Sequence, residues 1–314
     1  MARFVSRSLS DANRLSREEI EQLRVAAFSA PVWRRGGNSS LGRTTWQGQE
    51  VVVKDFRARR DAVERATREW HALSVLWHAG LRLAPKPIGA DLDQGLVVME
   101  WLNAEGFSQS FSTFEMLDLL SQLHELSARL HLGAVGKAAD AITSPEDLRM
   151  QTLARLELLG ESPTVRFESD KLQAIVRFLG LSTSTPTTPV TTLSPSDFGS
   201  HNLVRTGDGI RIVDLEFFGW DDAHKLIADS TIHPLASWNN GTLDDFTQRS
   251  IGLYELDESR LRVVRRGCLA KWCAIVLARA DRQFAAGEIA AHDASIVRAQ
   301  RYLEAAAPSG EHAD

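Results

Sequence analysis

A change in the spacing of apolar residues is the feature that most constrains how this 314-residue chain can fold. Residues 32–56 form short strand-like segments separated by turn residues such as Gly, Asn and Gln, which predicts a three-stranded meander. Residues 61–79 place apolar side chains three or four positions apart and are followed by Gly80, which predicts a long helix. The largely apolar run 96–102 then predicts a buried strand.

Helical spacing dominates from residue 103 onward. Helices are predicted over 114–132, 145–159, 169–179, 260–284 and 289–306. Near the start of the chain, Ser16 and Glu19 form a capping box for a helix that begins at about Arg17. The pattern predicts an α+β fold in two lobes. Residues 1–102 form a small N-terminal lobe with an antiparallel β-sheet and a long helix, and residues 103–314 form a larger, mainly α-helical lobe.

Charge and cysteine usage limit the partners and the compartment that we expect. Lys and Arg number 36 against 41 Asp and Glu, so no excess of positive charge draws the chain to nucleic acid or to an anionic membrane. No apolar stretch approaches the ~20 residues of a membrane span. Cys268 and Cys273 lie five residues apart, a spacing that predicts two buried free thiols. A cytoplasmic location is therefore expected.

Polar residues that suit phosphate chemistry gather around a predicted hairpin. The turn signal at 206–209 brings the residue that enters the first strand near the residue that leaves the second, so we expect Asn202 and Asp214 to face one another. Their amide and carboxylate oxygens suit magnesium, together with the phosphate oxygens of a nucleotide. Asp197 approaches from the preceding loop, where its carboxylate could accept a proton from a substrate hydroxyl.

The order of these residues resembles that of a known family. Asp197 and Asn202 are followed by an apolar strand that ends in Asp214, while Lys54 closes an earlier strand and Glu69 lies in the next long helix. The sequence is thus similar to the aminoglycoside phosphotransferase and choline kinase family, small-molecule kinases with a protein-kinase-like fold. The resemblance extends from about residue 35 to 272. It implies transfer of the γ-phosphate of Mg-ATP to a hydroxyl group of a small molecule.

The resemblance also implies roles for individual residues. Lys54 would hold the α- and β-phosphates of ATP and be oriented by Glu69. Asp197 would be the catalytic base. Asn202 and Asp214 would bind Mg²⁺. A segment that covers the phosphates would be formed by Gly36, Gly37, Asn38, Ser39 and Ser40. Backbone groups of Glu100 to Leu102 would contact the adenine.

Two departures from the family pattern leave an alternative open. Pro195 and Gly199 stand where the family often has histidines, so a catalytically silent, nucleotide-binding regulatory protein of the same fold is the alternative to an enzyme. No diagnostic motif identifies the acceptor, and aminoglycosides, sugars and amino alcohols all suit the same core. ATP or GTP as donor and the oligomeric state are also open.

Other polar residues near the hairpin allow more than one interpretation. His201 is interpreted as a hydrogen-bonding surface residue without a catalytic role. Four acidic residues lie near a tryptophan, namely Glu216, Asp221, Asp222 and Asp229 with Trp220. They either receive a cationic substrate or form a solvated acidic surface.

Overall fold

The structure is a computed structural model that describes residues 15–29, 34–35, 39–103, 111–160, 162–178, 188–234 and 240–307. The chain packs as two compact units, each built from two stretches of sequence. The first unit contains residues 1–139 and 193–220, and the second contains 140–192 and 221–314. The predicted boundary between the lobes at residue 102 lies just after strand β5 (Leu96–Glu100). The division of the chain into lobes at this residue stays a prediction.

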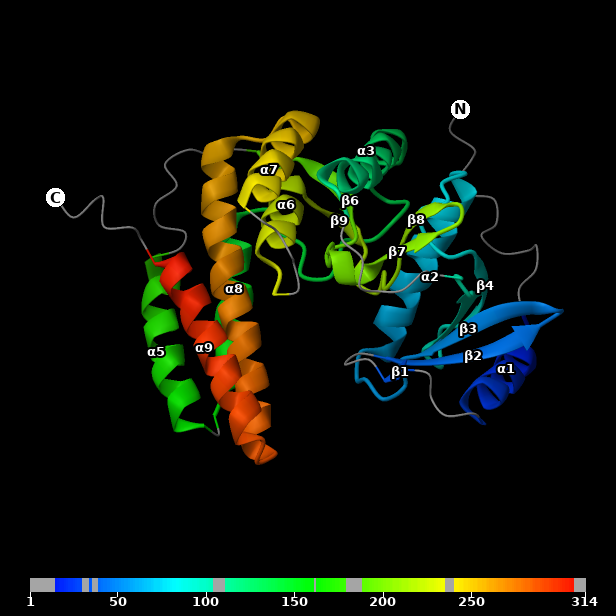
Figure 1. Ribbon diagram of the computed structural model, residues 1–314, viewed down its shortest axis with the longest axis horizontal. Coiled ribbons are helices and arrows are strands. Elements are labelled where there is room, and N and C mark those ends of the chain that lie inside the picture. Colours follow the sequence, from blue (N-terminus) through cyan, green and yellow to red (C-terminus); the bar gives the residue numbers. More distant parts are fainter. Residues whose placement is uncertain are drawn as a thin grey trace. The chain divides into compact units, whose positions relative to one another are not determined.

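A five-stranded antiparallel sheet forms the N-terminal part of the first unit (Figure 1). Its spatial order is β1-β2-β3-β5-β4. The strands are β1 (Arg34–Arg35), β2 (Ser40–Trp46), β3 (Gln49–Asp55), β4 (Pro87–Asp91) and β5 (Leu96–Glu100). Gln47 and Gly48 connect β2 to β3 with positive φ angles of 49° and 77°, as a two-residue hairpin turn requires. The meander and the strand after residue 96 are confirmed, whereas β4 was not predicted.

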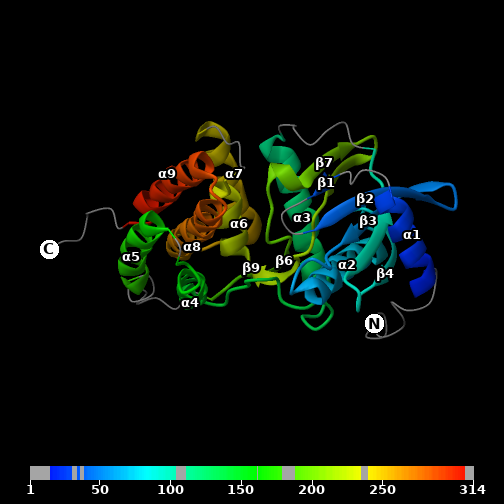
Figure 2. The same ribbon diagram turned by 90° about the horizontal axis from the view of Figure 1, so that it is seen from below.

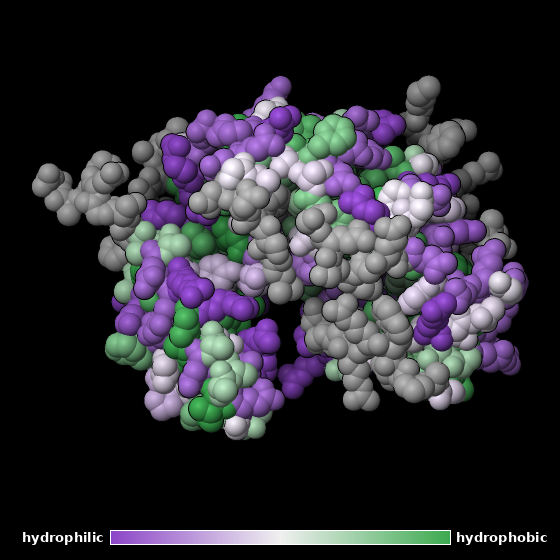
Figure 3. Space-filling model, in the orientation of Figure 1, coloured by the Kyte–Doolittle hydropathy of each residue, from purple (hydrophilic) through white to green (hydrophobic). Residues whose placement is uncertain are grey.

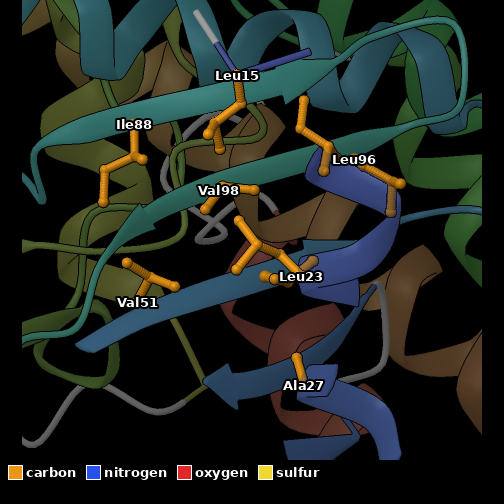
Figure 4. Close-up of a cluster of buried hydrophobic side chains, with 9 residues drawn as sticks. Leu15, Leu23, Ala27, Val51, Ile88, Leu96 and Val98 are labelled. Carbon is orange, nitrogen blue, oxygen red and sulfur yellow. The ribbon is translucent and has the colours of Figure 1, made fainter. Parts of the chain in front are cut away.

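Helix α1 (Arg17–Ser29) packs against β2, β3 and β4. The predicted capping box begins it, because the Glu19 N–H donates to Ser16 Oγ at 3.2 Å and the Ser16 N–H donates to the Glu19 carboxylate at 2.7 Å. The buried core of this layer is shown in Figure 4 and contains Leu15, Ile20, Leu23, Ala27, Val51, Val53, Ile88, Leu96 and Val98. Alternate residues of β3 and β5 thus face α1.

The alternation along β3 turns Lys54 to the side opposite Val53. Lys54 is paired in the sheet with Leu41 of β2 and Val97 of β5. Helix α2 (Ala62–His78) packs against β4 and β5 and ends before Gly80, whose φ is 79°. The predicted helix over 61–79 is therefore confirmed.

The rest of the first unit carries the predicted hairpin. Helix α3 (Thr113–Arg129) lies in this unit, and a short 3₁₀ turn, η1 (Ser200–Asn202), leads into β7 (Leu203–Thr206) and β8 (Gly209–Ile212). Leu203 pairs with Ile212 and Thr206 with Gly209, so the hairpin is confirmed. Strands β6 (Thr191–Ser194) and β9 (Gly219–Asp222) lie where the chain passes between the units.

The second unit is helical in its described residues. Its helices are α4 (Pro145–Leu156), α5 (Pro163–Phe178), α6 (Ala223–Ile232), α7 (Asn240–Tyr254), α8 (Glu258–Ala285) and α9 (Ile289–Ala306). Helix α8 packs against α4, α5, α6 and α9, and it runs beside α9 in both ribbon views (Figure 2). Cys268 and Cys273 are buried free thiols in α8, as predicted. The α+β class is thus confirmed.

The helices have mixed surfaces. Figure 3 shows hydrophilic and hydrophobic side chains interspersed over the visible face of the helical unit. Among the helices that the structure describes, none is both long and apolar enough to cross a membrane.

The close approach of α1 to β2 predicts the effect of adding one methyl group. A Cβ atom at Gly42 would lie 2.8 Å from the Ala27 Cβ and 2.9 Å from its backbone oxygen. We expect Gly42→Ala to lower the free energy of unfolding by about 1–3 kcal/mol, because backbone atoms cannot move aside cheaply. Urea unfolding measures this. Gly133→Ala is the matched control, since its Cβ would meet nothing within 4 Å; equal stability of the two variants would contradict the packing argument.

Candidate active site

A buried ammonium group surrounded by carboxylates forms the centre of the site. Lys54 is 4% exposed, and its Nζ donates to Glu69 Oε2 at 2.9 Å and to Asp214 Oδ1 at 2.5 Å. A third carboxylate oxygen, Oε2 of Glu216, lies 3.6 Å from the same nitrogen. The structure therefore brings together Lys54, Glu69 and Asp214, which the sequence analysis selected from positions up to 160 residues apart.

Local backbone geometry explains why these groups converge. Lys54 lies near the end of β3, and Glu69 lies near the middle of α2. Asp214 follows β8 and has a φ of 63°, a left-handed conformation that ends the strand and is tolerated by aspartate. The Asp214 side chain is 40% exposed, so one side of its carboxylate reaches solvent while Oδ1 meets Lys54.

The electrostatic balance keeps Lys54 charged. Burial alone would lower the pKa of Lys54, but the carboxylates of Asp214, Glu69 and Glu216 outweigh it and raise this pKa above its ordinary value. Burial raises the pKa of Glu69 against the opposing effect of Lys54, and Asp214 raises it further. Burial likewise raises the pKa of Glu216, to about 7. The site therefore holds an excess of acceptor oxygens around one ammonium.

Arg65 belongs to this site and was missed by the sequence analysis. Its Nη1 donates to Glu216 Oε1, and its Nε donates to Asp61 Oδ2 at 2.7 Å. The guanidinium carbon also lies 4.8 Å from the ring centre of Phe217. The signal in the sequence is the four-residue spacing of Arg65 and Glu69, which places both on one face of α2.

The loop before the hairpin holds Asp197 and Asn202 together. Asn202 Nδ2 donates to the Asp197 carbonyl oxygen at 3.0 Å. His201 Nε2 lies 3.2 Å from Asp197 Oδ1, so the imidazole contacts the carboxylate of the predicted base. His201 thus forms a polar contact, as expected, although its side chain is only 22% exposed and its partner is the predicted base. Its position four residues after Asp197, in the short turn that leads into the hairpin, was the available signal.

The donor atoms near the hairpin fit a divalent cation. The Val213 N–H donates to the Asn202 carbonyl at 2.9 Å, which places Asp214 one residue beyond the pair. The Asn202 amide nitrogen faces the Asp197 carbonyl, which leaves the amide oxygen for another partner. One carboxylate oxygen from each of Glu69, Asp214 and Glu216 lies within 4.8 Å of the others. Hard oxygen ligands of this kind suit Mg²⁺.

The predicted nucleotide contacts are described in part. Gly36, Gly37 and Asn38 lie outside the described residues, whereas Ser39 and Ser40 lie at the start of β2.

The segment predicted to lie beside the adenine continues from β5. The Glu100 N–H donates to the Lys86 carbonyl at 3.0 Å, and the Trp101 N–H donates to the Glu50 carbonyl at 3.1 Å. Because these two N–H groups are engaged within the protein, adenine recognition by residues 100–102 would use other backbone groups of the segment, such as the Leu102 N–H.

Asp221 and Asp222 are buried and paired, so both interpretations of these two residues were wrong. In the second unit, Asp221 is 3% exposed and accepts from Lys225 Nζ at 2.5 Å. Asp222 is 1% exposed and accepts from Arg260 Nε at 2.9 Å. Asp222 also accepts from His224, whose Nε2 is an acceptor for the backbone N–H of residue 257. Asp222 caps the start of α6 by accepting from the His224 N–H, and these paired charges offer no surface to a cationic substrate.

An ion pair between α3 and β7 predicts a pH-dependent stability. Glu115 accepts from Arg205 Nη1 at 2.6 Å, and this hydrogen bond, with further hydrogen bonds from Ser112, lowers the pKa of Glu115 to about 2. A lowered pKa stabilises the fold fully above the ordinary value near 4.5, and this contribution is lost as the pH falls through about 2. We expect Glu115→Gln to cost about 1 kcal/mol at pH 7 and progressively less below pH 4.5.

Urea unfolding at pH 7, 5 and 3 measures this difference between Glu115→Gln and the unchanged protein. Glu125→Gln is the matched control, because Glu125 is an exposed residue of the same helix. A cost for Glu115→Gln that did not shrink with falling pH would contradict the ion-pair assignment.

Comparison with known proteins identifies sequence and fold relatives. The profile of the family described as "Phosphotransferase enzyme family" matches residues 29–249. No curated protein sequence matches the chain.

Solved structures share the fold at low sequence identity. A choline/ethanolamine kinase family protein from Mesorhizobium loti is 17% identical with a TM-score of 0.55, over 93% of this chain and 95% of that one. A macrolide 2'-phosphotransferase from Brachybacterium faecium is 17% identical with a TM-score of 0.56, over 88% and 96%. A spectinomycin phosphotransferase solved with ADP and spectinomycin is 13% identical with a TM-score of 0.56, over 92% and 94%. The kinase-like α+β fold predicted from the sequence is thus confirmed.

Proposed function

This chain belongs to the phosphotransferase enzyme family, and from that membership we propose that it transfers the γ-phosphate of Mg-ATP to a hydroxyl group of a small molecule. The proposed acceptor is of the aminoglycoside, sugar or amino-alcohol type. The contact of Lys54 Nζ with both Glu69 and Asp214 carries the proposal. This contact supports the proposal because a cation suited to phosphate oxygens lies beside a partly exposed carboxylate suited to a metal ion.

Lys54 and Glu69 would act on the nucleotide. The Lys54 ammonium binds the α- and β-phosphates, and the carboxylate of Glu69, which is only 1% exposed, keeps it directed there. Ser39 and Ser40, with the glycines before them, lie at the sequence position suited to cover the phosphates. Residues 100–102 offer backbone groups to the adenine. Because the chemistry depends on positioning and charge, these groups need form no covalent intermediate.

Asn202 and Asp214 would hold Mg²⁺ with their side-chain oxygens. When bound, Mg²⁺ supplies positive charge that offsets the charge of the phosphate groups. The amide of Asn202 is oriented by the Asp197 carbonyl, and the carboxylate of Asp214 is the most exposed of the three around Lys54. These two side chains therefore have the atom types that a hard cation needs, and the Asp214 carboxylate also reaches solvent.

Asp197 would accept the proton of the acceptor hydroxyl. Its side chain is 29% exposed, which leaves it accessible to a substrate, and His201 contacts its Oδ1. A carboxylate held by an imidazole keeps a defined direction as the proton is transferred. Pro195 occupies the position of a common family histidine, and His201 offers an imidazole to the same loop from the other side of Asp197.

The test is ADP release from ATP with Mg²⁺ across panels of aminoglycosides, sugars and amino alcohols. We expect release with one class of acceptor. Asp197→Asn should lower kcat by at least about 100-fold, because it removes the base, while the affinity for Mg-ADP changes less than about threefold. Calorimetry measures that affinity.

Glu125→Gln is the matched control for this experiment, since it removes a carboxylate from an exposed helix position. Turnover retained by Asp197→Asn would contradict its assignment as the base. Binding of Mg-ADP with no release for any acceptor would favour the catalytically silent alternative over a phosphotransferase.

A further inference from the structure

Helix α2 is joined to the Lys54 site by two charged side chains. Arg65 and Glu69 lie four residues apart and therefore on one face of the helix. Glu69 accepts from Lys54, and Arg65 donates to Glu216. Glu216 also lies 3.6 Å from the Lys54 ammonium, so Arg65, Glu216, Lys54 and Glu69 form a series of alternating charges that begins and ends on α2.

Burial fixes the geometry of the Arg65–Glu216 pair. Side-chain exposure is 9% for Arg65 and 0% for Glu216. A buried carboxylate is costly unless it is paired, so Glu216 is bound to its cations rather than to water. The guanidinium is fixed by three contacts at once, since it also donates to Asp61 and lies over the ring of Phe217. A planar guanidinium group held by several contacts keeps a fixed orientation, whereas a lysine ammonium would not.

This series of charges matters because Lys54 has competing partners. Three carboxylates lie within 3.6 Å of its nitrogen when the chain is alone. Under the proposed function, Asp214 turns to the metal ion and Lys54 turns to phosphate. Glu69 must then hold the ammonium, and Glu216 must not displace the phosphate from it. A second cation beside Glu216 lowers that competition, and Arg65 is in hydrogen-bond contact with Glu216.

We propose that Arg65 is a positioning residue of this site: its ion pair with Glu216 fixes α2, and hence Glu69, against Lys54. The same pair keeps the Glu216 carboxylate from competing with the nucleotide for Lys54. The role of the pair in nucleotide binding rests on the proposed function. The anchoring of α2 does not, because it follows from contacts within the unliganded protein.

Hydrogen exchange of α2 tests the anchoring without any substrate. We expect Arg65→Gln to speed the exchange of α2 amides about tenfold, because it leaves Glu216 buried with one weak partner. Arg65→Gln/Glu216→Gln should exchange more slowly than Arg65→Gln alone, because the double variant leaves no unpaired buried charge. Arg65→Lys, which keeps the charge without the planar guanidinium group, should lie between the unchanged protein and Arg65→Gln.

Two controls separate positioning from general destabilisation. Asp61→Asn removes the other carboxylate partner of Arg65 and keeps the pair with Glu216, so its α2 exchange should stay within about twofold of the unchanged protein. Exchange of α8, in the other unit, should be the same in all variants, which shows that none unfolds as a whole.

The affinity for Mg-ADP provides the second readout. This affinity should be about tenfold weaker in Arg65→Gln than in the unchanged protein. Arg65→Gln/Glu216→Gln should regain at least half of the lost affinity on a logarithmic scale. The proposal would be overturned if the effects of Arg65→Gln and Glu216→Gln on the affinity for Mg-ADP were independent and multiplied in the double variant. It would also be overturned if the α2 amides of Arg65→Gln exchanged no faster than those of Asp61→Asn. Absence of ADP release from the unchanged protein would contradict the proposed function alone, since neither readout needs an acceptor.

Discussion

The buried ammonium of Lys54 is the charge around which the first unit is organised. A buried cation is stable only when carboxylates reach it, and here they come from α2 and from the segment after β8. Each of these segments must therefore be placed to within hydrogen-bond distance. The sheet supplies the rigid base, because β3 is paired on both sides at Lys54.

The same arrangement supports the proposed binding of a nucleotide. Glu69 and Glu216 are enclosed, whereas the Asp214 carboxylate is 40% exposed and can exchange Lys54 for another cation. Of the three carboxylates around Lys54, the one that can most easily release it is thus the one that is exposed to solvent. Arg65 maintains this difference by binding the carboxylate that would otherwise compete.

The sequence was sufficient where a short-range pattern reflected a local physical rule. The capping box at Ser16, the meander, the turn at 206–209 and the helices at 258–306 follow from spacing and turn chemistry. Strand β4 was missed because Pro87 and Gly89 weaken its pattern; Gly89 is required since a Cβ there would lie 2.8 Å from Leu15. Glu216 and Asp222 were misinterpreted because Arg65 and Arg260, which pair with them, lie far away in sequence.

Magnesium-dependent binding of ATP, measured by calorimetry, tests the central claim that the carboxylates around Lys54 form a nucleotide and cation site. We expect the unchanged chain to bind ATP at least about tenfold more tightly with Mg²⁺ than without it, and Asp214→Asn to lose that difference while remaining folded. Equal binding with and without Mg²⁺, or a full magnesium effect in Asp214→Asn, would contradict the account.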